Sequence, residues 1–362
     1  MSDEIRDLAD AGGAAELWDE IASTSPEGWF WATRAMHDFR MAYMEVSGYL
    51  IADRSFAFIR DGRACGLVPL VLGSDRQDGD IAASYMDAPL PWPMIAAGVP
   101  DRKGIELVLF DELEKRVRLA KAAMLRLTLA PPGLGVEMAA PFARIVRDRG
   151  FVDTSYLSHW VEVSSDTLRT VRARYRQYVR KFWDQYDLAV LAAQDIPEDF
   201  AQTYMDLHVK DAGRVSRPLV TYERQVDMAR RGEGFWVTAR NKATDRIVGI
   251  LMISVYKGAA YDASVAVDPE YQDDQISNLM KWKTIQHLLE LGVQHYELGI
   301  DAFAPSYLWQ PSEKNYGISF FKDGWSRGRK KTVWVAEKFY SRDSFDRFWE
   351  RKRQAILEHF SI

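Results

Sequence analysis

The stretch that decides the fold is Phe56-Ala-Phe-Ile-Arg-Asp-Gly-Arg-Ala-Cys-Gly-Leu-Val-Pro-Leu-Val-Leu72. Two apolar runs flank a charged Asp-Gly turn, a pattern that predicts two strands joined as a β-hairpin. The second half of the chain repeats the pattern in residues 235–240 and 247–255, again around a polar turn. Gly249 follows its turn as Gly66 follows the first one. We therefore expect the same hairpin twice.

The segments after each hairpin also recur in the same order. Each half continues with a third strand, an amphipathic helix, a short strand, a further helix and a last strand. In the first half these segments are 83–88, 105–121, 124–129, 141–151 and 159–163, and in the second half 260–267, 277–291, 295–299, 316–325 and 332–335. Phe56 and Phe235 are 235 − 56 = 179 positions apart. Solenoid repeats run roughly 20 to 50 residues, so this period indicates a duplicated domain.

The predicted fold class is α/β (α+β), with two tandem domains that are each a mixed sheet flanked by helices. The domains are expected to be residues 1–158 and 159–362. A chain of 362 residues suits two domains, since single cores rarely grow past roughly 250 to 300 residues. The first copy is crowded by Pro89, Pro91 and Pro93 after its third strand. We expect it to be a structural partner of the second copy, which we expect to carry the functional site.

Composition narrows the class of protein. Hydrophobic residues make up 47% and charged residues 27%, which is typical of a globular chain. No apolar run approaches the roughly 20 residues that span a bilayer, and we expect a cytoplasmic protein. The six histidines and the single cysteine lack metal-ligand spacing, so no metal is expected. The net charge of −5 argues against DNA as a partner.

Three motifs of the second half carry a family resemblance. They are Asn278-Leu-Met-Lys-Trp-Lys-Thr-Ile-Gln286, Tyr296-Glu-Leu-Gly299 and Phe320-Phe-Lys-Asp-Gly-Trp325. Together with the duplication, they resemble the FemAB-like (Fem-type) transferases, which have a tandem GNAT fold. The resemblance implies an acyltransferase that joins an acyl or aminoacyl group to an amine. Cell-envelope precursors are the usual acceptors in that group, and aminoacyl-tRNA or an acyl thioester is the donor.

The donor segment departs from the usual thioester motif. GNAT enzymes that use acyl-CoA carry Gln/Arg-x-x-Gly-x-Gly/Ala there, whereas this chain has Gln272-Asp-Asp-Gln-Ile-Ser277. Both glycines are missing, and two aspartates stand where a pyrophosphate would bind at a helix N-terminus. The missing glycines and the two aspartates favour aminoacyl-tRNA slightly over acyl-CoA as co-substrate. The alternative is a thioester site that has lost its usual motif. No tightly bound cofactor is expected. The predicted donor-binding residues are Gln272, Gln275, Ser277, Asn278 and, on a basic turn, Arg327, Arg329 and Lys330.

Amide formation requires a deprotonated amine and stabilisation of the charge that develops on the donor carbonyl. Asp262 lies on the third strand, where strands of the GNAT fold splay apart, and Glu297 and Asp301 end the next strand. One of these three carboxylates is the predicted base, although substrate groups carry much of the proton transfer in Fem-type enzymes. Lys322 matches the lysine of the closing motif, and Tyr316 is a candidate acid. The alternative for each is an ordinary strand-end or surface residue.

Two basic segments are candidates for acceptor binding. Residues 169–183 form a predicted amphipathic helix with an arginine face that includes Arg176 and Arg180. Lys210, Arg214 and Arg217 lie in a segment that resembles the arginine-bearing segment of the acceptor groove in Fem-type enzymes. Trp92, in a proline-rich loop predicted to be neither strand nor helix, is a further candidate. A solvated helix face and a packed connection are the alternatives.

The leading hypothesis is an amide-forming transferase that acts on a small or envelope-type amine. The alternatives are an acyl-CoA-dependent N-acyltransferase for an amino sugar or amino acid, and a non-catalytic duplicate that binds a nucleotide sugar or tRNA. The sequence leaves open the acceptor, the group transferred and the oligomeric state.

Overall fold

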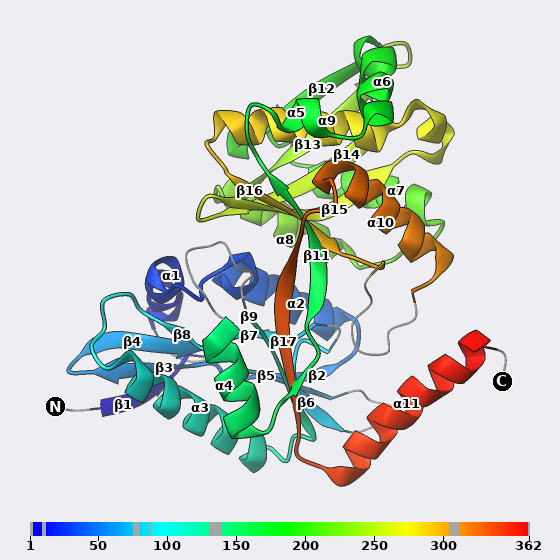
Figure 1. Ribbon diagram of the computed structural model, residues 1–362. Coiled ribbons are helices and arrows are strands. Elements are labelled where there is room, and N and C mark those ends of the chain that lie inside the picture. Colours follow the sequence, from blue (N-terminus) through cyan, green and yellow to red (C-terminus); the bar gives the residue numbers. More distant parts are fainter. Residues whose placement is uncertain are drawn as a thin grey trace. The chain divides into compact units, whose positions relative to one another are not determined.

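The structure is a computed structural model that describes residues 3–8, 12–74, 80–86, 88–129, 139–303 and 311–360. The chain forms two compact units. Unit 1 comprises Met1–Leu157, Ala304–Ser312 and Thr332–Ile362, and unit 2 comprises Ser158–Phe303 and Glu313–Lys331. Figure 1 labels the elements of both units.

The units are not the contiguous halves expected from the sequence. β17 (Lys330–Phe339) pairs antiparallel with β9 (Met124–Leu129), with Trp334 opposite Leu129 and Phe339 opposite Met124. These backbone hydrogen bonds place the C-terminal residues from Thr332 onward in unit 1. The last strand of the second sequence repeat therefore completes the first unit.

Unit 2 is built on one mixed sheet. Its strand order is β12 (Tyr186–Leu191), β13 (Gly234–Asn241), β14 (Arg246–Tyr256), β15 (Ala259–Val267), β16 (His295–Ile300) and β11 (Tyr156–Glu162). Neighbouring strands are antiparallel except β15 and β16, which are parallel. The predicted second hairpin is the β13–β14 pair, which confirms that element.

Helices cover both faces of this sheet. They are α5 (Thr167–Thr170), α6 (Ala173–Phe182), α7 (Phe200–Ala212), α8 (Leu219–Arg230), α9 (Ile276–Glu290) and α10 (Glu313–Ser326). Phe235 packs edge-on against His287 of α9, at 4.7 Å between ring centroids, while Trp236 packs against Phe200 and Tyr204 of α7. Because successive strand residues point to opposite faces, α9 and α7 lie on opposite sides of the sheet.

The single helix predicted over residues 169–183 is wrong in its first part. Val171 is extended (φ −55°, ψ 159°) and separates α5 from α6. The backbone N–H of Arg172 donates to the carbonyl of Gly324 at 2.9 Å, so the chain leaves the helical path to meet the end of α10. A tertiary hydrogen bond and the burial of Val171 thus override the helical periodicity.

Unit 1 contains two sheets. The first has the order β1 (Asp3–Asp7), β3 (Phe56–Arg60), β4 (Arg63–Val68) and β8 (Met94–Ile95). The second contains β17, β9, β6 (Ile81–Ala83), β5 (Val71–Ser74) and β2 (Leu50–Asp53), with β10 (Val152–Asp153) beside β17 and β7 (Leu90–Pro91) beside β9. The accompanying helices are α1 (Ala14–Thr24), α2 (Arg34–Val46), α3 (Arg102–Leu119), α4 (Ala139–Arg149) and α11 (Arg342–Phe360).

A proline explains why the apolar run after the first turn is divided into two strands, β4 and β5, that belong to different sheets. Pro69 lies between β4 and β5 and has no N–H to donate to a strand ladder. At this bend the N–H of Leu70 donates to Ser55 Oγ at 3.0 Å, and the N–H of Arg54 donates to the Leu70 carbonyl at 2.7 Å. The corresponding β14 of unit 2 contains no proline and runs unbroken for 11 residues.

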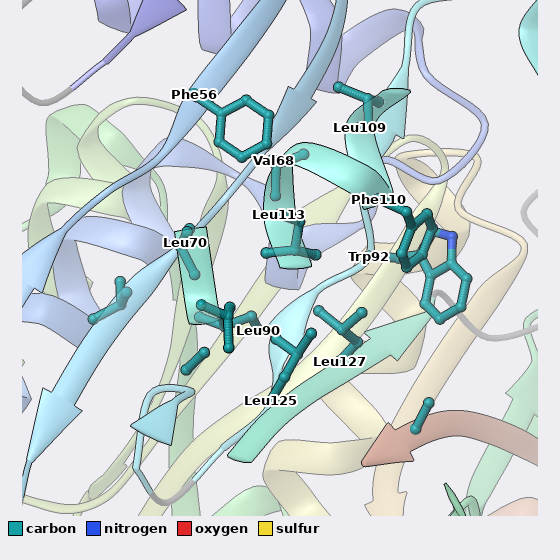
Figure 2. Close-up of a cluster of buried hydrophobic side chains, with 14 of the residues drawn as sticks. Phe56, Val68, Leu70, Leu90, Trp92, Leu109, Phe110, Leu113, Leu125 and Leu127 are labelled. Atoms are coloured by element: carbon teal, nitrogen blue, oxygen red, sulfur yellow. The ribbon is translucent and has the colours of Figure 1, made fainter. Parts of the chain in front are cut away.

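The proline-rich loop of unit 1 does not expose its tryptophan, Trp92, to solvent. Trp92 is 2% exposed and packs edge-on against Phe110 at 5.1 Å between ring centroids, within the core drawn in Figure 2. Leu90–Pro91 forms a short strand parallel to β9, contrary to the prediction that this loop holds no strand. The N–H of Trp92 donates to Thr128, so the loop is anchored to the sheet. Trp92 is therefore a core residue and contacts no acceptor in the folded unit.

The repeated glycines have the same role in both units. A Cβ at Gly66 would lie 2.7 Å from Leu109 of α3, and a Cβ at Gly249 would lie 2.6 Å from Ile276 of α9. In each unit the absence of a side chain lets a helix approach a hairpin strand. This shared close contact is physical support for the duplication.

We expect Gly249→Ala to destabilise the protein by about 1–3 kcal/mol, because the added methyl group overpacks the contact between β14 and α9. The matched control is Gly317→Ala on α10, where an added Cβ meets nothing within 4 Å. Urea unfolding of both variants measures the difference. Equal stability of the two variants would show that the close approach is unimportant.

Candidate functional site

The main feature of unit 2 is the point at which β15 and β16 stop pairing, which we call the opening between them. Their parallel pairing covers only Ala259–Tyr261 opposite His295–Glu297, although β15 continues to Val267. Beyond Glu297, β16 pairs on its other side with β11, where Ser158 lies opposite Ile300. The two strands therefore diverge immediately after Tyr261 and Glu297, and Asp262 is the first residue of β15 beyond the paired stretch.

A β-bulge in β15 lies at this opening. Met252 of β14 lies opposite Ser264, and the next residue, Ile253, lies opposite Asp262, so one extra residue is inserted in β15. Asp262 and Ser264 would share a face in a regular strand, but they contact different helices. Asp262 meets Lys281 of α9, whereas Ser264 hydrogen-bonds Tyr204 of α7. The bulge thus supplies polar side chains to both faces of the sheet at one point.

Lys281 is a buried partner of Asp262 that the sequence reasoning missed. Its side chain is 4% exposed, and Nζ donates to Asp262 Oδ2 and, at 2.9 Å, to the Tyr296 hydroxyl. Burial lowers the pKa of Lys281, and the neighbouring Asp262 carboxylate opposes this shift. The sequence does hold one signal that Lys281 is buried, which is its helical spacing. Asn278, Lys281 and Ile285 recur on the buried face of α9.

Of the three predicted catalytic carboxylates, Glu297 is the second most deeply buried, after Asp301. It is 2% exposed, and the Ser158 hydroxyl donates to its Oε1 at 2.8 Å. Its Oε2 is buried and has no hydrogen-bond partner among the described residues. Burial raises the pKa of Glu297 to about 7, while the Ser158 hydrogen bond and the charge of Lys322 act in the opposite direction.

Lys322 of α10 reaches the end of β16. Its Nζ donates to the Ile300 carbonyl at 3.4 Å and would lie 3.2 Å from a Cβ at Gly299, where φ is +89°. Burial lowers the pKa of Lys322, and the charges of Asp262, Glu297 and Asp301 oppose that shift. Three of the predicted catalytic carboxylates thus act electrostatically on Lys322, the fourth predicted group.

Asp301 and Tyr316 differ from the other predicted groups in their direct contacts. Asp301 is fully buried and lies 3.1 Å from His159 Nε2 and 2.6 Å from Lys330 Nζ. The Lys330 hydrogen bond contributes to a lowered pKa of Asp301, in spite of the burial that favours its neutral form. Tyr316 is 40% exposed and stacks on Phe303 at 6.1 Å between ring centroids. The Asp301 carboxylate is thus already paired, and Tyr316 lies on the surface of α10.

The predicted donor segment is the turn between β15 and α9. Residues Pro269–Asp274 form a 3₁₀-helix, and Gln275 adopts the left-handed conformation (φ 58°, ψ 39°) just before α9. Asn278 Nδ2 donates to Gln275 Oε1 at 3.2 Å, while the Tyr186 hydroxyl donates to Asp274. Gln272 is exposed and Ser277 is half-buried at the start of the helix.

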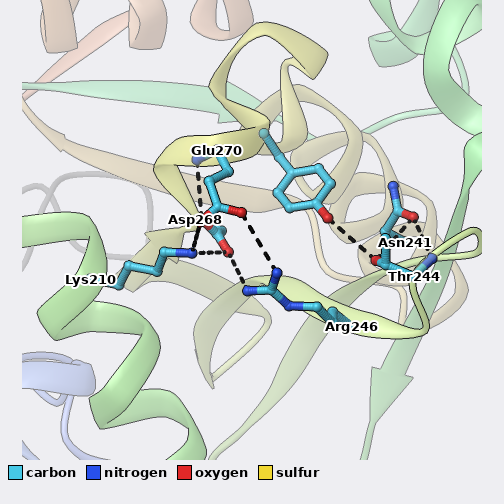
Figure 3. Close-up of polar contacts among 7 residues, drawn as sticks. Lys210, Asn241, Thr244, Arg246, Asp268 and Glu270 are labelled. Atoms are coloured by element: carbon cyan, nitrogen blue, oxygen red, sulfur yellow. Dashed lines mark hydrogen bonds and ion pairs between the residues drawn. The ribbon is translucent and has the colours of Figure 1, made fainter.

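Lys210 links α7 to this donor segment. Its Nζ lies 2.8 Å from Asp268 and 2.7 Å from Glu270, and Arg246 also contacts Asp268, at 3.3 Å (Figure 3). Asp268 is 1% exposed and accepts from the N–H of Glu270, which fixes the start of the 3₁₀-helix. The charge of Lys210 is thus neutralised within the protein.

Arg217 is the acceptor-binding candidate that lies beside β15. It donates to Ser264 at 3.0 Å and to Gln225 at 3.1 Å, and its guanidinium stacks 4.3 Å from the centre of the Tyr222 ring. Arg214 is exposed in the preceding loop. The structure therefore brings Arg217, but not Lys210, into contact with the bulged segment.

The remaining arginines do not form one surface. Arg176 donates to the carbonyls of Arg169 and Val171, which closes the break before α6, while Arg180 is exposed on that helix. Arg329 pairs with Glu162 at 3.2 Å, and Arg327 is exposed with a left-handed backbone after α10.

Within the described residues, no group of three or more histidine, cysteine or acidic side chains is arranged to hold a metal ion. No described helix is long and apolar enough to cross a membrane.

The class of protein follows from this geometry. The divergence of β15 from its parallel neighbour agrees with the splayed strands expected from the GNAT resemblance. Residues 169–307 match the family profile described as Acetyltransferase (GNAT) domain. The match covers the opening and the donor segment, and it supports an acyltransferase.

Similarity to solved structures covers nearly the whole chain. The crystal structure of FemX matches with a TM-score of 0.68 and 11% identity, over 96% of this chain and 99% of that one. A tandem GNAT protein from the clavulanic acid biosynthesis pathway matches with a TM-score of 0.50 and 14% identity, over 94% and 99%. The C-terminal domain of a putative lysylphosphatidylglycerol synthetase from Agrobacterium fabrum matches with a TM-score of 0.54 and 13% identity, over 83% and 87%.

The predicted FemAB-like, tandem GNAT fold is thereby confirmed. No curated protein sequence matches the chain.

Proposed function

We propose that the protein is an amide-forming transferase that moves an acyl or aminoacyl group from an activated donor to an amine. The observation that carries this proposal is the point where β15 and β16 stop pairing, at Tyr261 and Glu297. Asp262 follows next on β15, and Lys322 donates to the Ile300 carbonyl at the end of β16. Attack of an amine on a carbonyl requires a proton acceptor and a positive or N–H group near the developing oxyanion. Asp262, Glu297 and Lys322 belong to unit 2, which we therefore propose as the catalytic unit.

Lys322 has the role of oxyanion stabiliser in this proposal. Lys322 is half-buried, and electrostatic stabilisation is stronger in such surroundings than in bulk solvent. The backbone of β15 beyond Tyr261 no longer pairs with β16, although it still pairs with β14, and we propose that an N–H group on the β16 side is an additional donor to the oxyanion. Arg217, next to Ser264, is the proposed contact for an anionic group of the acceptor.

Aminoacyl-tRNA is the donor that we favour. Asp273 and Asp274 place two carboxylates just before the N-terminus of α9, where the pyrophosphate of coenzyme A would lie. Negative charge at this point disfavours that anion. The proposed acceptor is a small amine or an envelope-type precursor, as the FemAB-like resemblance implies.

One observation favours acyl-CoA as a second candidate. Gln275 occupies the place of the first glycine of the thioester motif and keeps a left-handed backbone, with φ at 58°. This is the conformation that a glycine supplies most easily. The turn that would present backbone N–H groups to a pyrophosphate is thus retained in spite of the lost glycines.

A donor competition separates these candidates. The purified protein is incubated with a mixture of amines and with either a full set of aminoacyl-tRNAs or a set of acyl-CoAs, and mass spectrometry detects new amides. Products that require aminoacyl-tRNA and disappear after ribonuclease treatment support the first candidate. Products from acyl-CoA alone contradict it and support the second, and absence of any product contradicts both.

A further inference from the structure

We propose that Lys210 is a positioning residue that fixes the donor segment relative to the opening, and that it acts on the binding of the donor and not of the acceptor. This inference rests on the proposed transferase function and adds a residue that sets where the donor lies. Three observations carry it: the ion pairs of Lys210, the course of α7 along β15, and the separate attachment of Arg246 to the same carboxylates.

Lys210 makes two ion pairs with the start of the donor segment (Figure 3). Its Nζ lies 2.8 Å from the Asp268 carboxylate and 2.7 Å from that of Glu270. Asp268 is 1% exposed and accepts from the N–H of Glu270 at 3.1 Å, so Lys210 binds the residue that caps the 3₁₀-helix. Burial alone would raise the pKa of Asp268, but the hydrogen bonds from Lys210 and from the Glu270 N–H lower it below its ordinary value. Asp268 is therefore ionised near neutral pH.

The helix that carries Lys210 contacts β15 at successive points between the opening and the donor segment. The hydroxyl of Tyr204, a fully buried residue, hydrogen-bonds Ser264 next to the β-bulge. Farther along the strand, Asp211 accepts from the N–H of Val267 at 3.4 Å. Lys210 then contacts the donor segment itself. Helix α7 thus runs beside β15 from the bulge to the donor segment.

This course of α7 connects the proposed acceptor contact with the donor segment. Ser264, which α7 holds through Tyr204, also accepts from Arg217 at 3.0 Å. One helix of 13 residues therefore contacts both places within unit 2. Reaction between two bound substrates requires that their reacting atoms are held in a fixed geometry. The ion pairs of Lys210 supply such a fixed relation for the donor.

Lys210 and Arg217 differ in the charge of their partners. The guanidinium of Arg217 donates to Ser264 and Gln225, which are uncharged, so its positive charge remains for an anionic group of the acceptor. The ammonium of Lys210 faces two carboxylates, which neutralise it. Of these two predicted acceptor-binding residues, Lys210 is thus the one whose charge serves the protein itself.

Arg246 contacts the same two carboxylates from a different element. It belongs to β14 and lies 3.3 Å from Asp268 and 3.6 Å from Glu270. Its strand has a second link to the donor segment, because the N–H of Asp268 donates to the Val248 carbonyl at 2.8 Å. Removing Arg246 leaves that backbone link in place, whereas removing Lys210 takes away both ion pairs between α7 and the segment. The two cations are therefore matched in charge and differ in what they attach.

The test compares wild type with Lys210→Met, Lys210→Arg and the matched control Arg246→Met. Asp268 keeps one cationic partner in each variant, so all three proteins should fold. We expect Lys210→Met to raise KM for the donor by about 5–30-fold, the effect of losing a charged hydrogen-bonded pair. Its kcat and its KM for the amine should stay within about twofold of wild type, since only donor binding is affected. Lys210→Arg should restore most of the donor affinity, and Arg246→Met should match wild type within about twofold.

Steady-state kinetics use pooled aminoacyl-tRNAs and acetyl-CoA as donors, with the amine of the mixture that wild type acylates fastest. A raised KM for the amine with an unchanged KM for the donor would overturn the inference, because Lys210 would then contact the acceptor. Equal effects of Lys210→Met and Arg246→Met would also overturn it, since they would reflect local charge alone. The transferase function would stand in both cases. A wild-type protein that forms no amide with either donor would contradict the proposed function instead.

Hydrogen–deuterium exchange of the protein without substrates gives a readout independent of turnover. We expect the amides of residues 269–278 to exchange about 5–30-fold faster in Lys210→Met than in wild type, because the segment opens locally more often without its attachment to α7. Lys210→Arg and Arg246→Met should exchange at nearly the wild-type rate. Unchanged exchange in Lys210→Met would contradict the positioning role, whatever the outcome of the transfer assays.

Discussion

Replacing Lys322 with alanine is expected to lower kcat/KM by about 10²–10³-fold, the effect of removing one donor to a developing oxyanion. The reason is that Lys322 supplies a positive charge at the end of β16 that has no carboxylate ion pair among the described residues, whereas Lys281 is paired with Asp262. Its hydrogen bond to the Ile300 carbonyl, at 3.4 Å, is long, so its removal should change stability little. Steady-state kinetics and thermal unfolding of the same preparation measure both quantities.

Lys314→Ala is the matched control for this experiment. Lys314 lies on the same helix as Lys322 but is exposed. We expect the control variant to retain wild-type kcat/KM within about twofold, since isolated exposed charges contribute little. Similar activity of Lys322→Ala and Lys314→Ala would contradict the role of Lys322. A loss of thermal stability in Lys322→Ala would assign that lysine to folding instead.

Replacing Lys281 with methionine is expected to destabilise the protein by about 3–5 kcal/mol, because the substitution leaves the Asp262 carboxylate without its buried partner. Lys281 is 4% exposed and also donates to Tyr296, so two hydrogen bonds are lost together. The free energy of unfolding comes from urea titrations monitored by tryptophan fluorescence. This is the largest effect on stability that we expect from a single substitution in unit 2.

The double variant Lys281→Met/Asp262→Asn distinguishes pairing from simple packing. Removing both charges should recover most of the lost stability, since replacing both partners of a buried pair is often close to neutral. Additive losses in the double variant would show that Lys281 stabilises the fold by packing alone. The two substitutions would then be independent, contrary to the contact between their side chains.

Local patterning predicted most of the fold. The hairpins around residues 60–63 and 241–246 follow from apolar runs beside turn residues, and both form as β3–β4 and β13–β14. The sequence pattern did not reveal that Pro69 divides the run after the first turn into β4 and β5 of two sheets, because the bend depends on a hydrogen bond from Leu70 to Ser55. It also did not reveal that β17 returns to unit 1, because strand pairing between distant segments leaves no local signal.

The candidate site was predicted only in part. Carboxylates at strand ends pointed to Asp262 and Glu297, and a family motif pointed to Lys322. Lys281 was missed, because a lysine within an apolar stripe looks like an exception until its buried carboxylate partner is known. Charged residues such as Lys210 looked available for ligands, whereas internal ion pairs occupy them. A residue pattern within one segment carries no information about ion pairs with a distant segment.

The most direct test of the central claim is whether the protein forms an amide at all. Donors labelled with ¹³C at the carbonyl carbon, as aminoacyl-tRNA and as acyl-CoA, are incubated with a primary amine and with wild type or Lys322→Ala. Carbon-13 NMR then follows the labelled carbonyl. We predict that wild type moves the label into an amide and that Lys322→Ala does so at least about a hundredfold more slowly. Label that is only hydrolysed, or that stays in the donor with both donor types, would contradict the account.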